Sequence, residues 1–203
     1  MTRTTDRRSS ILSGAAELFA RQGVASSTVR QIADRVGMLS GSLYHHFPSK
    51  DAMVVEILTG YLDNLLARYR SVLGEGLSPR ARLERLVHAS LTEAELFPHA
   101  TLVYQNELTY LRSGETVRSH PGFEGVRAAA AEVQQTWMDV IEAGRADGSF
   151  RTDIDARVFY RFLRDSVWLA VHWHRPDGGP GIDRLAGDCV SLFLDGFATF
   201  DEA

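Results

Sequence analysis

Apolar residues recur along this chain every three or four positions, which is the period of an α-helix with one buried face. The pattern predicts a first helix from about Arg7 to Gln22, ended by Gly23, and a long proline-free helix from Asp51 to Gly74. No segment shows the alternation that is typical of a strand, and no repeat is present. The fold is therefore predicted to be all α, with about nine helices.

The other helix boundaries follow from capping residues, glycine and proline. Ser78 and Pro79 are suited to begin a helix that continues to about Phe97, and Pro98 begins the next one. Later helices are predicted at about 124–147, 155–173 and 182–200. Residues 175–181, rich in proline and glycine, form the clearest loop of the chain.

Two short helices joined by a tight turn are predicted between residues 28 and 47. Their facing apolar residues are Ile32, Ala33, Val36, Leu43 and Phe47. Gly37 supplies a turn residue that can adopt positive φ, and the small Ala33 lets the two helices cross closely. This is the spacing of a helix-turn-helix, a motif that binds DNA. The alternative is a small helical hairpin with incidental polar residues.

The second of these helices, predicted from Leu39 to His46, presents short or hydrogen-bonding side chains outward. Short side chains let the backbone approach base edges, and longer polar ones reach phosphates or bases. Thr28 can cap the first helix of the helix-turn-helix and can also contact a phosphate. Ser49 can cap the helix that begins near Lys50, so that Lys50 points at the phosphate backbone of the same DNA. The residues predicted to contact DNA are Thr28, Ser40, Gly41, Ser42, Tyr44, His45 and Lys50.

Charge is divided unevenly along the 203 residues. Residues 1–50 carry seven basic and three acidic side chains, a net charge of 7 − 3 = +4. The formal charge of the whole chain is −4, so residues 51–203 carry −8. Only the first fifty residues should attract a polyanion. We therefore predict a DNA-binding domain at 1–50 and a separate domain at 51–203.

The remaining composition excludes several classes of protein. The one cysteine, Cys189, lies among apolar neighbours and cannot form an intramolecular disulfide, which fits a packed thiol in a reducing compartment. No signal peptide or apolar run long enough to span a membrane is seen, so a soluble cytoplasmic protein is expected. The histidine pairs 45–46 and 172/174 lack the further ligands of a metal site, and no catalytic motif appears. We expect no enzyme, metal or cofactor.

The segment Thr28 to Phe47 with the following Pro-Ser-Lys50 resembles the TetR family of bacterial transcriptional repressors, most specifically in Leu43-Tyr-His-His-Phe-Pro-Ser-Lys50. The resemblance implies three N-terminal helices that bind double-stranded operator DNA, a connecting fourth helix and a C-terminal helical domain that binds an inducer. It also implies a homodimer, here through the predicted helices 155–173 and 182–200. The alternative is that the last apolar stripe packs only within its own chain.

A closer resemblance covers residues 39–47, 53–70 and 160–178. These segments are similar to repressors of late steroid-ring degradation in cholesterol-using bacteria, a subgroup of the same family. The resemblance implies control of genes for breaking down steroid rings C and D, with release from DNA by a CoA thioester of the bicyclic ring remnant. The alternative within the family is a repressor that senses a lipophilic drug or a fatty acyl-CoA and controls efflux or lipid metabolism.

One face of the predicted helix 155–173 has the chemistry for a CoA thioester. Arg157, Arg161, Arg164, Trp168 and His172 follow each other at spacings of 4, 3, 4 and 4. Guanidinium groups clamp phosphates, and an indole offers a stacking surface for a purine. Phe162 and Leu169 are assigned to the core on other faces, so this stripe is not simply the buried side. The alternative is a solvated or dimer-facing stripe, paired with acidic neighbours.

The acyl part of such a ligand needs an apolar chamber, although most aromatic residues in a helical protein are ordinary core. The residues predicted to bind the effector are Arg161, Arg164, Trp168 and His172 for the polar end, and Tyr104, Trp137 and Phe162 for the apolar end.

Overall fold

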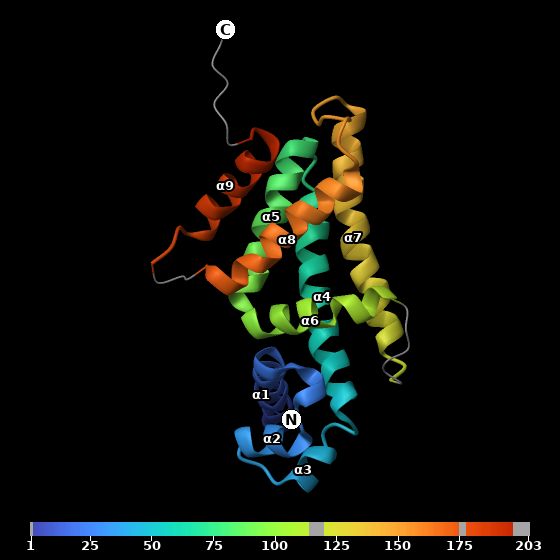
Figure 1. The fold of residues 1–203 in the computed structure, drawn as a ribbon. Coiled ribbons are helices and arrows are strands. Elements are labelled where there is room, and N and C mark those ends of the chain that lie inside the picture. Colours follow the sequence, from blue (N-terminus) through green and yellow to red (C-terminus); the bar gives the residue numbers. More distant parts are fainter. Residues whose placement is uncertain (1, 114–119, 175–177, 197–203) are drawn as a thin grey trace. The chain divides into compact units, whose positions relative to one another are not determined.

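The computed structural model describes residues 2–113, 120–174 and 178–196, and these ranges contain nine helices and no strand (Figure 1). The helices are α1 (Thr2–Ser26), α2 (Val29–Arg35), α3 (Ser40–Tyr44), α4 (Lys50–Leu73), α5 (Pro79–Leu96), α6 (Pro98–Ser113), α7 (Phe123–Ala146), α8 (Ala156–Trp173) and α9 (Ile182–Leu194). The prediction of an all-α fold is confirmed. Of the helices in the described residues, none is both long and apolar enough to cross a membrane.

Most predicted helix boundaries agree with the structure to within a few residues. Gly23 interrupts α1 with a φ of 80°, as its position after Gln22 predicts. The last helix ends at Leu194 instead of Phe200, and residues 197–203 lie outside the described part. So do residues 175–177 of the predicted loop.

Packing divides the chain into two compact units, Met1–Asn64 with Phe97–Ala131 and Leu65–Leu96 with Glu132–Ala203. Two helices, α4 and α7, contribute residues to both units. The domain boundary predicted after residue 50 stays a prediction, because the units reflect packing alone.

In the first unit, α1 packs against α2 and α6, and α2 packs against α3. Phe19, Ile32 and Leu43 form part of its buried core. Gly37 bends the chain between α2 and α3 with a φ of 65°. The Arg8 side chain of α1 donates two hydrogen bonds to Glu56 of α4 and one to the His46 carbonyl, and so fixes the segment that follows α3.

In the second unit, α5 packs against α8 and α9, and Figure 1 shows α8 running across α5. A polar chain is buried within this unit. The Trp137 indole donates to the Tyr69 hydroxyl at 2.9 Å, which lies 2.6 Å from Ser90 Oγ. Because Ser90 donates in turn to the Leu86 carbonyl, the Tyr69 proton goes to Ser90 and every group has a partner. This chain joins α7, α4 and α5.

Candidate functional site

The outward face of α3 carries the side chains that the sequence predicts to contact DNA. Leu43 is fully buried and anchors the short helix. Gly41, Ser42, Tyr44 and His45 are exposed, with Tyr44 at 55%, and Ser40 is half-buried. Leu39, the N-cap of α3, is 80% exposed and was not predicted to contact DNA. Because Leu43 is the one fully buried residue of α3 and Gly41, Ser42 and Tyr44 are exposed, the surface of this helix is available to a partner.

Thr28 forms the predicted N-cap of α2. Its side chain accepts a hydrogen bond from the Gln31 backbone nitrogen at 3.2 Å, and the Gln31 side chain accepts one from the Thr28 nitrogen at 2.8 Å. This reciprocal capping box fixes where α2 begins. Thr28 remains exposed, so its contact with a phosphate stays a prediction.

Lys50 has a structural role that its sequence position did not predict. Its ammonium group donates to the backbone carbonyls of Val24 and Ser27 at 2.5 and 2.8 Å, and lies 3.4 Å from the Ala25 carbonyl. The helix before it is capped as predicted, because Ser49 Oγ accepts from the Ala52 nitrogen at 3.1 Å. Lys50 thus holds the end of α1 to the start of α4, and its contact with DNA stays a prediction.

Burial divides the cationic stripe of α8. Arg164 and Trp168 are buried, with 8% and 4% of their surface exposed, whereas Arg157, Arg161 and His172 are exposed. The stripe is thus not simply the buried side, as the sequence predicts, but Arg164 and Trp168 belong to that side. Both are buried together with Tyr160, Leu163 and Val167 of the same helix.

The guanidinium group of Arg164 lies between aromatic rings. Its central carbon is 5.5 Å from the centroid of Tyr160 and 5.9 Å from that of Trp168. Its Nε donates to Asp165 Oδ1 at 2.7 Å, and Asp165 is itself exposed. A cation within about 6 Å of a ring is attracted by the ring's negative face. Arg164 is thus a buried charge held by two rings and one half-solvated carboxylate.

Only some of the predicted effector residues are brought together. The Tyr160 ring is 6.3 Å from Trp137, so Trp137, Tyr160, Arg164 and Trp168 form a continuous column inside the second unit, which we call the aromatic column. Tyr104 belongs to the first unit, where its ring lies 5.4 Å from Tyr61. The sequence could not separate these two groups, because both lie on helices with similar periodicity.

Phe162 and Leu169 are not core residues in the single chain, contrary to expectation. They are 66% and 49% exposed, and Val158 and Trp173 beside them on α8 are also exposed. Leu192 of α9 is half exposed as well. We call these five residues the α8–α9 apolar face. Helical period alone identifies an apolar face, but it does not say whether the same chain or another covers it.

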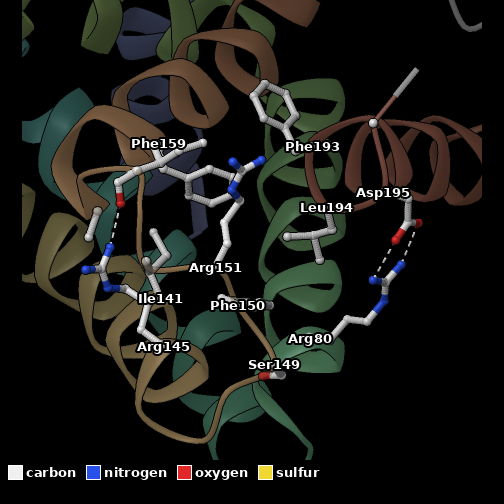
Figure 2. A pocket seen from close by; sticks show the side chains of 13 residues that line it. Arg80, Ile141, Arg145, Ser149, Phe150, Arg151, Phe159, Phe193, Leu194 and Asp195 are labelled. Carbon is white, nitrogen blue, oxygen red and sulfur yellow. Dashed lines mark hydrogen bonds and ion pairs between the residues drawn. The ribbon is translucent and has the colours of Figure 1, made fainter. Parts of the chain in front are cut away.

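A cavity in the second unit is lined by residues from α5, α7, α8 and α9 (Figure 2). None of the seven predicted effector residues lines it. Among the described residues there is no cluster of three or more metal-ligating side chains. Cys189 is half-buried, and this burial raises the pKa of its thiol to about 11, as expected of a packed cysteine.

Comparison with known proteins adds to this geometry. A family model for bacterial regulatory proteins of the tetR family matches residues 11–57, and one for the tetracyclin repressor-like C-terminal domain matches residues 76–197. The chain is 46% identical over 193 residues to the HTH-type transcriptional repressor KstR2 of Rhodococcus jostii, covering 95% of this chain and 92% of that protein. The KstR2 repressor of Mycobacterium tuberculosis is 41% identical, covering 94% and 92%.

Solved structures agree with these sequence matches. The ketosteroid transcriptional regulator KstR2 of Mycobacterium tuberculosis superposes with a TM-score of 0.82 at 38% identity, covering 96% of each chain. The similarity therefore extends over both the helix-turn-helix and the C-terminal helices.

Proposed function

The chain belongs to the TetR family of bacterial transcriptional regulators, and from this premise we propose that it is released from operator DNA by a steroid-derived CoA thioester bound at Arg164 and Trp168. Its relatives are transcriptional regulators, so the function is repression and not catalysis. The effector and its site are the parts that we infer.

The steroid part of the proposal is supported by the relatives. KstR2 proteins that align with nearly the whole chain include one described as a ketosteroid regulator. We infer that this chain controls genes of steroid-ring catabolism, for which a CoA thioester of a ring remnant is a suitable signal. The ring system would lie against apolar side chains, and the nucleotide tail against the cationic part of α8.

The position of Arg164 is the observation that carries the effector site. A buried charge is costly unless it is well paired, and here the carboxylate partner is largely in solvent. A phosphate or thioester oxygen would give the guanidinium group a stronger charge-assisted bond than the rings do. The exposed Arg161 and His172 follow the same edge of α8 and would extend the contact toward the nucleotide.

The α8–α9 apolar face supports a homodimer. Five large apolar side chains on two neighbouring helices remain exposed in the single chain. Exposed apolar patches of this kind mark interaction sites, and pairing two such helices from each protomer gives a four-helix interface. We infer that a second copy of the chain covers Phe162, Leu169 and Leu192.

Through the aromatic column, binding of the effector at Arg164 can affect the position of α4. Arg164 contacts Tyr160, Tyr160 contacts Trp137, and Trp137 is hydrogen-bonded to Tyr69 on α4. The same helix begins at Lys50, directly after the helix-turn-helix. Two recognition helices of a dimer must reach major grooves about 34 Å apart, so a small tilt of α4 misplaces them. A ligand that favours the tilted state releases the repressor.

Replacing Arg164 by alanine tests the effector site. Release of a labelled operator is measured by fluorescence anisotropy as the CoA thioester of a bicyclic steroid-ring acid is added. We expect R164A to bind the operator as the unaltered protein does, but to need at least tenfold more thioester, because a charge-assisted hydrogen bond contributes about 1.5–3 kcal/mol.

The matched control is R184A, which removes an exposed arginine of α9 that pairs with Asp188. This variant should respond normally. Unchanged release in R164A contradicts the proposed site. Release by fatty acyl-CoA or a lipophilic drug, and not by the steroid thioester, contradicts the proposed ligand class.

A further inference from the structure

The cavity of the second unit has a volume of about 420 Å³, within the range of small-molecule sites. It lies between the start of α5, the end of α7, the segment that joins α7 to α8, the start of α8 and the end of α9. Its apolar wall includes Ile141, Phe150, Phe159 and Phe193, and the last two rings meet edge to face with centroids 6.0 Å apart. Figure 2 shows these two rings beside the cavity.

Two of the three arginines that line this cavity donate hydrogen bonds to the segment between α7 and α8. Arg145 donates to the Ile154 carbonyl at 2.6 Å, and Arg151 donates two hydrogen bonds to Asp153 at 2.7 and 2.5 Å. The bonds from Arg151 lower the pKa of Asp153 to about 2. Arg145 and Arg151 are therefore both hydrogen-bonded to residues close to them in the sequence.

Arg80 is different, because its partner comes from the far end of the chain. Its two terminal nitrogens donate to the two carboxylate oxygens of Asp195 at 2.9 and 2.7 Å. Figure 2 shows the two side chains pointing toward one another at one edge of the cavity. Arginine binds carboxylates in this forked geometry, and here the guanidinium group lies beside an apolar wall. Both side chains are half exposed, so solvent and solutes reach them.

We propose that this cavity binds a medium-chain aliphatic carboxylate, whose carboxylate replaces that of Asp195 on Arg80 while its chain lies along Phe159 and Phe193. Displacement of Asp195 costs little overall, because the ligand's carboxylate forms the same forked pair with Arg80 that Asp195 gives up, and burial of the aliphatic chain then favours binding. The N-terminus of α5, where Arg80 lies, adds a positive potential that favours the anion. Binding frees the end of α9 from the start of α5. This site is separate from the one at Arg164.

Calorimetric titration of the full chain with sodium decanoate, kept below its micelle-forming concentration, tests the proposal. We expect one decanoate per chain. R80M should weaken binding at least tenfold, since it removes a charge-assisted pair of hydrogen bonds. D195N should tighten binding, because it removes the internal competitor. A purely structural ion pair predicts that both variants change affinity in the same direction.

Two controls accompany the titration. R85M alters another exposed arginine of α5, one that pairs with Glu75 and does not line the cavity, and it should bind decanoate normally. Decyltrimethylammonium has the same chain length and the opposite charge, and it should not compete with decanoate. The proposal is overturned if the unaltered protein does not bind decanoate, or if R80M and D195N shift its affinity in the same direction.

Discussion

The indole nitrogen of Trp137 donates a hydrogen bond of 2.9 Å to the hydroxyl of Tyr69, and this bond ties α7 to α4 inside the second unit. It lies at one end of the aromatic column that leads to Arg164. The bond therefore matters both to the stability of this unit and to any signal that passes from α8 to α4.

Removing the Tyr69 hydroxyl should destabilise the protein. Y69F leaves the buried Trp137 donor without its acceptor, and an unsatisfied buried group costs about 1–3 kcal/mol. Urea denaturation measures the loss. Y44F removes an exposed hydroxyl instead and should change the free energy of unfolding by less than about 0.5 kcal/mol. Equal stability of the two variants would show that the buried chain contributes nothing.

Replacing Lys50 by methionine separates a structural role from a phosphate contact. K50M loses the bonds to the Val24 and Ser27 carbonyls, and we expect about 1.5–3 kcal/mol less stability. If Lys50 also contacts a phosphate, as its sequence position predicts, the logarithmic dependence of operator affinity on salt should fall in slope by about 0.9 for each protomer. An unchanged slope together with the loss of stability would show that the role of Lys50 is structural alone.

A charge on the α8–α9 apolar face should separate the protomers. F162E places a carboxylate where we infer that a second copy packs, and sedimentation should show a monomer with weaker operator binding. Y44E changes an exposed aromatic residue on α3 and should weaken operator binding while leaving the dimer intact. A dimeric F162E protein would place the interface elsewhere.

The thiol of Cys189 should react slowly. Burial raises its pKa to about 11, so about one thousandth of it is ionised at pH 8, and the thiolate is the reactive form. Above about pH 9 the unfolded thiol ionises while the folded one keeps its proton, so the free energy of unfolding falls as the pH rises from there to about 11. The rate of reaction of Cys189 with a disulfide reagent at pH 8 is measured for the native protein and for the protein unfolded in urea. Equal rates in the two states would contradict the raised pKa of the folded thiol.

The sequence predicted what is local and missed what depends on distant partners. Thr28, Gly37 and Ser49 fix helix ends through bonds or turns within a few residues, and the structure confirms each. The bonds of Lys50 reach back more than twenty residues, and no pattern along the chain signals them.

Burial on α8 was misjudged for a related reason. Phe162 looks like a core residue because it is apolar, and Arg164 looks like a surface residue because it is charged. The structure reverses both, since Arg164 is buried beside Tyr160 and Phe162 is exposed. The cavity at Arg80 and Asp195 could not be predicted either, because it joins residues 115 positions apart.

Coupling between effector and operator tests the central claim most directly. Calorimetry gives the affinity of the steroid-derived CoA thioester for the free repressor and for the repressor saturated with operator. We predict weaker binding in the presence of operator, by the same factor by which the thioester weakens operator binding, because such coupling is reciprocal. Equal affinity for the thioester with and without operator would contradict the account.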